Sequence, residues 1–291
     1  MKVLITGAAS KLGEKLIESL GESGVEIVAL VHEKRINAPG AKVTPVSADL
    51  LDLAGLENAF KNIDLVVHLA ALTHARRPAD YFKVNVIGTK NVISACQKNK
   101  VPRLIFVSTR AIGEKAGAYG QSKYLAEQAV VTSGLEWLIF RPSEIYGLNG
   151  KEGIDRLINL AQNSFLMPIL GRGQYALNPV YFQDVIKVLV MAITKPKFAN
   201  KLYTVCGPKD YSYKELTVLL ANHFRKKKIF IPLPVGALKL LSWFGFFFQD
   251  QVPRLLAAKS SDISALVKDY EFQPTSIAEY LNRQYGSFSQ L

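Results

Sequence analysis

Cysteine and histidine are scarce in this sequence of 291 residues. The two cysteines, Cys96 and Cys206, lie far apart in apolar segments, which argues against a disulfide framework or a cysteine metal site. They favour a reducing compartment. The four histidines show no spacing typical of metal ligands, so we expect no metal.

Long apolar runs are also lacking. A span across a bilayer core of about 30 Å needs about 20 apolar residues, and the least polar patch, Trp243 to Phe248, is much shorter. We interpret this patch as core or lid packing, with an interfacial helix or the wall of an apolar pocket as the alternatives. The N-terminus, MKVLITGAAS, is typical of a strand rather than a signal peptide. We therefore expect a cytoplasmic protein with no integral membrane segment.

Acidic side chains are outnumbered: 36 Lys and Arg face 24 Asp and Glu, a net charge of +12. The densest basic run, residues 225–228, falls at the end of an expected helix, where cations suit the helix dipole. No nucleic-acid motif with interleaved aromatic residues accompanies it. We therefore expect no nucleic-acid partner.

Apolar residues make up 49% of the chain, enough for a substantial core. The apolar run at residues 2–6 stops at Gly7, and residues 11–24 follow with helical periodicity. Further short strands, separated by helices and turns, are expected at residues 25–31, 43–47, 64–71, 103–108 and 136–140. This alternation predicts an α/β fold, a Rossmann-type doubly wound parallel sheet.

The turn between the first strand and the first helix reads Gly7-Ala-Ala-Ser10-Lys11-Leu12-Gly13. Gly7 permits a tight turn and Gly13 close helix–strand packing, while the helix N-terminus suits a pyrophosphate. Ser10 stands at the central position of the turn, where a glycine is usual, and its hydroxyl could reach a phosphate. An ordinary βα turn is the plain alternative, but the βα units that follow favour dinucleotide binding.

The end of the second strand bears on which dinucleotide binds. Val31 occupies the place where a carboxylate usually holds the ribose diol. His32, Lys34 and Arg35 follow and suit a 2′-phosphate. We therefore expect NADP to be preferred, with NAD as the alternative.

Two later strand ends add candidate cofactor contacts. Asp49, followed by Leu50, could accept a hydrogen bond from an adenine amino group or serve as a helix N-cap. The fourth strand ends in small residues that let a cofactor pass, Leu69, Ala70 and Ala71. His68, inside that apolar run, is expected to be a core histidine with satisfied hydrogen bonds.

Tyr119 and Lys123 are four residues apart, so on a helix they share one face. A lysine ammonium beside a phenol favours the phenolate, which equips the tyrosine for proton transfer to or from an alcohol or carbonyl oxygen. Ser108 ends the fifth strand and offers a donor for the same oxygen. A chance Tyr-x-x-x-Lys pair is the alternative, and the other features at these strand ends argue against it.

The segments TGAASKLG, ADLLD, VVHLAA, NVIGTKNV, FVSTRAIG, YGQSK, FRPSEIYG and PVYFQDV occur in one order over residues 1–205. With them the chain resembles an extended short-chain dehydrogenase/reductase of the NAD-dependent epimerase/dehydratase family. The resemblance implies a Ser108/Tyr119/Lys123 triad, with Lys123 also holding the nicotinamide ribose. It further places Asp49 near the adenine, Asn85 behind the active site and the segment from Pro142 along the nicotinamide pocket.

Three departures from the family pattern narrow the chemistry. Thr109 and Arg110 replace the Asp-Glu pair of the 4,6-dehydratases, so we do not expect their elimination reaction. Leu177 stands where nucleotide-sugar epimerases carry a phosphate-binding arginine, although Arg172 lies nearby. The loop from Gly113 to Tyr119 is short for those enzymes. Together these departures weaken the hypothesis of a nucleotide-sugar substrate without excluding it.

We predict a cofactor domain at residues 1–140 and 176–206 and a substrate lobe at 141–175 and 207–291, with Asp184 as a structural anchor. The predicted function is NAD(P)-dependent hydride transfer at a carbinol or carbonyl carbon of a small molecule. A nucleotide-sugar 4-epimerase is the alternative within this chemistry. A non-catalytic, cofactor-binding scaffold is the alternative of another class, against which the intact triad argues. A homodimer is left open.

Overall fold

The computed structural model describes residues 1–32, 36, 42–150, 153–195, 197, 199–224, 227–234, 236, 253–254, 257 and 260–286. The chain forms two compact units. The first comprises Met1–Arg141 and Ile186–Tyr203, and the second Pro142–Val185 and Thr204–Leu291. The sequence predicted a return to the first domain at residue 176, earlier than the return at Ile186 in the structure.

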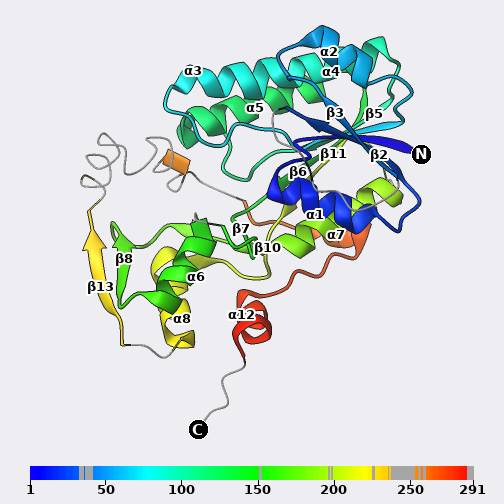
Figure 1. Ribbon diagram of the computed structural model, residues 1–291. Coiled ribbons are helices and arrows are strands. Elements are labelled where there is room, and N and C mark those ends of the chain that lie inside the picture. The colour runs from blue at the N-terminus through cyan, green and yellow to red at the C-terminus, as the bar shows by residue number, and fades with distance from the viewer. Residues whose placement is uncertain are drawn as a thin grey trace. The chain divides into compact units, whose positions relative to one another are not determined.

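A seven-stranded sheet organises the first unit, in the order β11-β6-β5-β4-β1-β2-β3 (Figure 1). The pairings from β6 to β3 are all parallel, so the predicted doubly wound parallel sheet is confirmed. The strands are β1 (Lys2–Thr6), β2 (Glu26–Val31), β3 (Val43–Ser47), β4 (Leu65–His68), β5 (Arg103–Val107), β6 (Glu136–Pro142) and β11 (Lys201–Val205).

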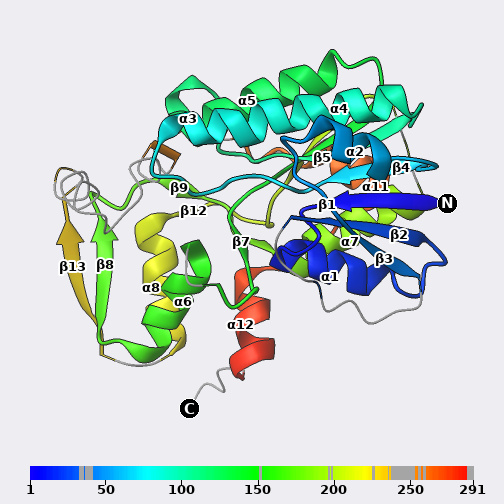
Figure 2. The same cartoon turned by 45° about the horizontal axis from the view of Figure 1, so that its top comes forward.

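Helices cover both faces of this sheet (Figure 2). They are α1 (Lys11–Leu20), α2 (Leu53–Ala59), α3 (Pro78–Tyr81), α4 (Gly88–Lys98), α5 (Gly117–Val131) and α7 (Phe182–Thr194). A π-helix, η1 (Phe82–Ile87), joins α3 to α4, and a 3₁₀ turn, η2 (Glu114–Ala116), precedes α5.

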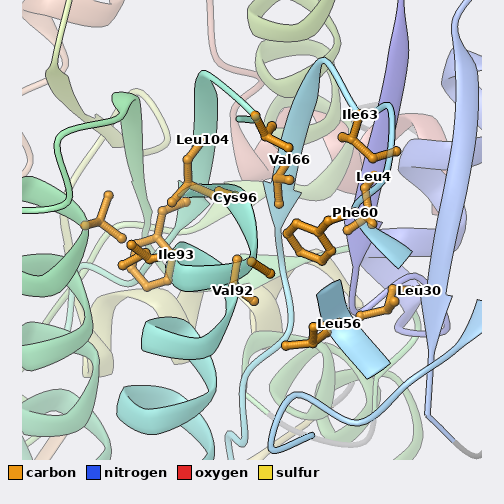
Figure 3. Packing of buried hydrophobic residues seen from close by; sticks show 14 of the residues in the cluster. Leu4, Leu30, Leu56, Phe60, Ile63, Val66, Val92, Ile93, Cys96 and Leu104 are labelled. Carbon is orange, nitrogen blue, oxygen red and sulfur yellow. The ribbon is translucent and has the colours of Figure 1, made fainter. Parts of the chain in front are cut away.

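The core on one face of the sheet explains why the strands read as continuous apolar runs. Leu4 of β1, Val66 of β4 and Leu104 of β5 pack against Phe60, which follows α2, and Val92 of α4 (Figure 3). Strands of a parallel sheet are buried on both faces because crossover helices lie over each. Burial of the leucine, valine and phenylalanine side chains contributes about 1.5–3 kcal/mol each, measured against leaving them exposed.

The register brings the carboxyl ends of the strands to one edge. Thr6 at the end of β1 is level with His68 of β4, and His68 is level with Phe106 of β5. The residues that follow these ends, among them Gly7, Leu69 and Ser108, therefore lie along the edge where open α/β sheets bind ligands.

The second unit is built around helices and short strand pairs. Its core includes Met167 and Leu216, and its Asp184 accepts hydrogen bonds from the backbone N–H and hydroxyl of Thr275, at 2.7 and 3.1 Å, as expected for an anchor. Its elements are β7 (Ile145–Tyr146), α6 (Gly153–Asn163), β8 (Leu166–Leu170), β9 (Ala176–Leu177), β10 (Val180–Tyr181), β12 (Tyr211–Ser212), α8 (Tyr213–His223), β13 (Ile229–Leu233), α11 (Ser264–Tyr270) and α12 (Ile277–Tyr285).

Within the described ranges, no helix is both long and apolar enough to cross a membrane. The apolar patch at residues 243–248 lies outside these ranges.

Candidate active site

The β1–α1 turn is built for close approach of backbone. Gly7 has φ of +69°, and a Cβ there would lie 2.7 Å from the backbone nitrogen of Ala70. A Cβ on Gly13 would meet the carbonyl oxygens of Gly7 and Ala8 more closely than a side chain tolerates. Both positions therefore require glycine, one because of its left-handed backbone and contact with the end of β4, the other because α1 packs directly on the turn.

Ser10 is the N-cap of α1. Its Oγ accepts a hydrogen bond from the Gly13 N–H at 3.0 Å, and its own N–H donates to the Gly7 carbonyl at 3.0 Å. The serine thus satisfies one of the unpaired donors of the helix N-terminus. Lys11 and Leu12 form the first helical turn, with Lys11 exposed and Leu12 half-buried.

At the ends of β2 and β3, His32 and Asp49 lie together. The His32 Nε2 is 3.6 Å from the Asp49 Oδ2, while the Asp49 Oδ1 accepts from the Leu51 N–H at 2.9 Å. A phosphate bound by His32 would have to share the imidazole with this carboxylate. Lys34 and Arg35, the other predicted cations of this cluster, lie outside the described residues.

Asn85 braces the segment that follows β4. Its side-chain oxygen accepts from the Leu72 N–H at 2.7 Å, and its amide group donates to the Leu72 carbonyl and to the Ser122 Oγ. The Ser122 hydroxyl donates in turn to the Tyr119 carbonyl at 2.8 Å. Both amide hydrogens of Asn85 are therefore used inside the protein, where they link the ends of β4 and the start of α5. Leu69, Ala70 and Ala71 are half-buried along this segment.

His68 is a satisfied core histidine, as predicted. Its Nδ1 is 2.6 Å from the Thr6 Oγ1 and its Nε2 is 3.0 Å from the Thr89 Oγ1. The Thr89 hydroxyl donates to the Asn85 carbonyl, so it accepts from His68, which assigns the proton to Nε2. Burial, with a smaller contribution from the charge of Lys123, lowers the pKa of His68 to about 3.

Ser108 follows β5 directly. Its N–H donates to the Phe140 carbonyl at 2.7 Å, and its side chain is 6% exposed. The Ser108 Oγ has no hydrogen-bond partner among the described residues. Buried hydroxyls are almost always paired, so this one is the kind of group that a ligand completes.

Lys123, on α5, reaches the same strand end. Its Nζ donates to the carbonyl of Val107 at 2.9 Å and lies 4.0 Å from the centroid of the Phe106 ring. The side chain is 1% exposed. Burial lowers the pKa of Lys123 to about 7, against the opposing effect of the Glu127 carboxylate.

Tyr119 lies one turn before Lys123 and is 8% exposed. Its ring meets that of Tyr81 edge to face, with centroids 5.9 Å apart. Gly120 is needed beside it, because a Cβ there would lie 2.8 Å from the Ala111 carbonyl oxygen and collide with the Ala116 side chain. The absence of a side chain therefore lets the 111–116 loop pack on the start of α5.

Two buried charged residues at this edge were not predicted to matter. Glu127 is 1% exposed and forms a two-pronged pair with Arg141, with N···O distances of 2.9 and 2.5 Å. Arg110, noted in the sequence only as a departure from a dehydratase motif, is 4% exposed. The (i, i+4) spacing of Lys123 and Glu127 was a signal that could have been used.

Other predicted features fall elsewhere. Pro142 ends β6 and is the first residue of the second unit. Leu50 lies next to Gly88, where an added Cβ would lie 3.1 Å from the leucine Cβ, and the Leu50 carbonyl accepts from the Asn91 side chain. In the part of the chain that the structure describes, no group of three or more His, Cys, Asp and Glu side chains could hold a metal ion.

A sequence model matches residues 3–206, that of the NAD dependent epimerase/dehydratase family. A UDP-glucose 4-epimerase from Vibrio cholerae is 27% identical over 300 residues, which is 94% of this chain and 90% of that protein. A 2-alkyl-3-oxoalkanoate reductase from Stenotrophomonas maltophilia is 29% identical over 63% of this chain and 62% of its own length.

Among solved structures, a UDP-glucuronic acid 4-epimerase from Bacillus cereus in complex with UDP-glucuronic acid and NAD has the same fold. The TM-score is 0.78 at 22% identity, and the match covers 95% of each chain.

Proposed function

This chain belongs to the NAD dependent epimerase/dehydratase family, and on that premise we propose that it is an NAD(P)-dependent oxidoreductase acting at a carbinol or carbonyl carbon. In this proposal Ser108, Tyr119 and Lys123 form the reaction centre. The substrate is a small molecule that presents one oxidisable hydroxyl or reducible carbonyl. An epimerase and a reductase are among the relatives of this chain.

The turn between β1 and α1 fits a dinucleotide pyrophosphate. Gly7 and Gly13 leave backbone bare where side chains would collide, and the N-terminus of α1 is a ready anion site. When bound, the nicotinamide supplies or accepts the hydride. The residues of the first unit that would hold such a cofactor are Gly7, Ser10, Lys11, Leu12 and Gly13 at the turn, Asp49, Leu50 and Leu69 to Ala71 along the sheet edge, and Asn85, Tyr119 and Lys123 beyond it.

Each residue of the centre has a distinct task. Tyr119 gives a proton to, or takes it from, the substrate oxygen as general acid or base. Ser108 donates a hydrogen bond to that oxygen from its buried hydroxyl. Lys123, with a pKa lowered to about 7 by burial, can change its charge near neutral pH and so adjust the proton affinity of the Tyr119 phenol, one turn earlier on the same helix.

The observation that carries the proposal is the hydrogen bond from the Lys123 Nζ to the carbonyl of Val107, the residue before Ser108. It ties the Tyr-x-x-x-Lys face of α5 to the strand end that bears an unpartnered buried hydroxyl. A chance pair of residues on a surface helix would not have these features together.

Replacement of Tyr119 by Phe tests the proposal, because it deletes one hydroxyl and keeps the ring. We expect turnover to fall by at least about 10² to 10⁴-fold, the range typical of general acid–base catalysis. Cofactor binding, followed by calorimetry, should survive because the turn at Gly7 is untouched. The assay is NADPH oxidation with a panel of ketones, aldehydes and oxidised sugars, beside melting curves with cofactor.

Tyr124→Phe is the matched control, since Tyr124 is 39% exposed on the same helix and should change nothing. A Tyr119→Phe protein that turns substrate over as fast as the wild type would contradict the role of Tyr119 as general acid or base. If the wild type has no activity at all, and the variants differ only in stability, the scaffold alternative gains instead.

A nucleotide-sugar 4-epimerase is the second candidate, favoured by the 27% identity to the Vibrio cholerae enzyme over nearly the whole chain. An epimerase must return the hydride to its own intermediate and therefore keeps its cofactor, whereas a dehydrogenase exchanges it at every turnover. Near-stoichiometric release of nicotinamide cofactor from the denatured, purified protein would put the epimerase first.

We further propose a preference for NADP and a cytoplasmic location. Val31 removes the usual ribose carboxylate, and His32, Lys34 and Arg35 supply positive charge for a 2′-phosphate. The buried thiols of Cys96 and Cys206, neither of which is in a disulfide, support a reducing compartment. A homodimer stays a proposal for measurement of mass in solution.

A further inference from the structure

The second unit contains a small two-stranded parallel sheet whose strand β13 is exposed over most of its length. β8 and β13 pair in parallel over five residues, from Ile229 level with Leu166 to Leu233 level with Leu170. Met167 and Ile169 of β8 point inward and are buried at 0% and 8% exposure. Since side chains alternate along a strand, the residues between them point outward.

In a parallel pair, residues at the same level lie on the same face, so Ile229 and Ile231 of β13 share a face with Leu166 and Pro168 of β8. We call this set of four apolar residues the open face. The next pair on that face, Leu170 and Leu233, is half-buried, and Leu170 packs against the core of the second unit. Ile229 is 59% exposed, Ile231 37% and Leu166 36%.

An open apolar face is unusual for parallel strands, which normally have both faces covered. On the opposite face Phe230, level with Met167, is 40% exposed, and Phe165, directly before β8, is 64% exposed. Clustered large apolar side chains at a surface mark a site of contact with another apolar phase.

Exposed cations lie at both ends of the sheet that carries the open face. Lys227 is exposed just before β13, and Arg172 is exposed just after β8, so a cation flanks each end of the sheet. Lys228 donates from its Nζ to the carbonyls of Ala161 and Ser164 and so holds a third cation at the end of α6.

The sequence on both sides of these strands continues that bias. Residues 156–183, which include β8, contain neither Asp nor Glu, and the same holds for residues 216–249, which include β13. The second stretch carries five cations, Arg225, Lys226, Lys227, Lys228 and Lys239.

We propose that the open face is a docking surface for an anionic lipid bilayer. Exposed apolar side chains are stabilised by contact with an apolar phase, and the cations beside them by contact with negative charge. The interface of an anionic bilayer offers both, since its acyl chains would contact the open face and its phosphate headgroups the flanking cations.

This inference goes beyond the proposed function, since peripheral attachment depends on the second unit alone and needs no catalysis. It places the protein at a membrane surface by peripheral contact of the second unit. Substrates that associate with the membrane would then reach the protein at a high local concentration.

The test is flotation of the full-length protein with vesicles of phosphatidylcholine and phosphatidylglycerol at about 3:1, beside pure phosphatidylcholine. We expect binding to the anionic vesicles that weakens at high salt, because exposed charges are screened. Ile229→Glu and Ile231→Glu should each weaken binding at least about tenfold, since either puts a charge into the apolar contact. Lys227→Glu should weaken it several-fold.

Two matched variants in α11 serve as controls. Val267→Glu places the same charge on a 43% exposed apolar position, and Lys268→Glu reverses an exposed cation. Neither should change vesicle binding. Melting curves show whether each variant is folded, and a variant that melts as the wild type does keeps the comparison valid.

Several results would overturn the proposal. Failure of the wild type to float with anionic vesicles is one, and equal binding to neutral vesicles is another. Loss that is as large in Val267→Glu as in Ile229→Glu would place the contact elsewhere. If Ile229→Glu instead converts a dimer to a monomer in light scattering, a second copy covers the face. If it only lowers the melting temperature, a segment of the same chain does.

Discussion

The ends of two neighbouring strands, β4 and β5, bury polar side chains in opposite ways. At β4, His68 has both ring nitrogens paired and stays neutral because burial lowers its pKa to about 3. At β5, the Ser108 hydroxyl has no partner among the described residues, and Lys123 is held on one carbonyl with a pKa near 7. Buried polar groups are normally satisfied, so the β4 end is typical of structure and the β5 end of chemistry.

Lys123→Met gives the sharpest form of this comparison. The change removes the charge and its hydrogen bond to the Val107 carbonyl but keeps an unbranched side chain of similar length. We expect turnover to fall by more than the roughly 10² to 10⁴-fold of Tyr119→Phe, because proton transfer and the ribose contact are both lost. Calorimetry should show weaker cofactor binding. Lys90→Met, at an exposed position of α4, is the control.

The same variant should change the pH dependence of stability. Because the folded pKa of Lys123 lies near 7 and below its unfolded value, the unfolded state binds more protons between about pH 7 and 10.5. Wild-type stability therefore gains from rising pH in that window, by at most roughly 1.4 kcal/mol per pH unit from this group. Urea unfolding should show a flatter profile for Lys123→Met, and an identical slope would contradict the burial argument.

Ser108→Ala should separate function from stability at the β5 end. The hydroxyl makes no bond within the described protein, so its removal should leave the free energy of unfolding unchanged or raise it by about 1 kcal/mol. Turnover should fall by roughly 10²-fold through loss of a donor to the substrate oxygen. Ser108→Thr keeps the hydroxyl and should recover part of the rate. An active but less stable Ser108→Ala protein would assign the serine to structure.

Much of the fold could be predicted because parallel strands are apolar throughout and end at glycine or polar residues. β1 and β3 begin and end where the sequence predicted. The fourth strand was predicted too long, to residue 71, whereas β4 ends at His68. The reason is that the next residues leave the ladder: the Ala70 N–H donates to the Thr6 side chain and Asn85 holds the Leu72 backbone.

The π-helix η1 and the strand β13 were not predicted. The hydrogen bonds of a π-helix span one residue more than those of an α-helix, and the apolar pattern of residues 82–98 fits both. β13 lies outside the main sheet and pairs with β8 across more than fifty residues of sequence, which local patterns cannot reveal. For the site, spacing identified Tyr119 and Lys123, but the Val107 contact and the missing partner of Ser108 are tertiary facts.

His68→Leu probes the satisfied end of the comparison. It leaves the Thr6 and Thr89 hydroxyls without this partner, so stability at pH 7.5 should fall by about 1–3 kcal/mol while turnover changes less than in Ser108→Ala. In the wild type, the unfolded state binds more protons between about pH 3 and 6.5, so stability falls as pH drops through that range. The deficit of the variant should therefore shrink in urea unfolding at pH 4.5. A constant deficit would show that His68 is not neutral in the folded protein.

The smallest expected effect concerns the choice between NADP and NAD at the end of β2, where the His32 Nε2 lies 3.6 Å from the Asp49 Oδ2. We expect NADP(H) to bind more tightly than NAD(H) at low salt, with a ratio that shrinks as salt screens the charges. Both side chains are substantially exposed, so each charge contributes at most about 1 kcal/mol, or roughly fivefold. Asp49→Asn removes the carboxylate that competes for His32, so we expect the ratio of NADP affinity to NAD affinity in calorimetric titrations to rise a few-fold. This should hold even if the affinities for both dinucleotides fall because the contact of Asp49 with the adenine is lost. Asp52→Asn, an exposed acid in the same turn, should leave the ratio unchanged. Equal or tighter NAD(H) binding by the wild type at low salt would overturn the preference, and an unaltered ratio in Asp49→Asn would show that His32 does not meet the 2′-phosphate.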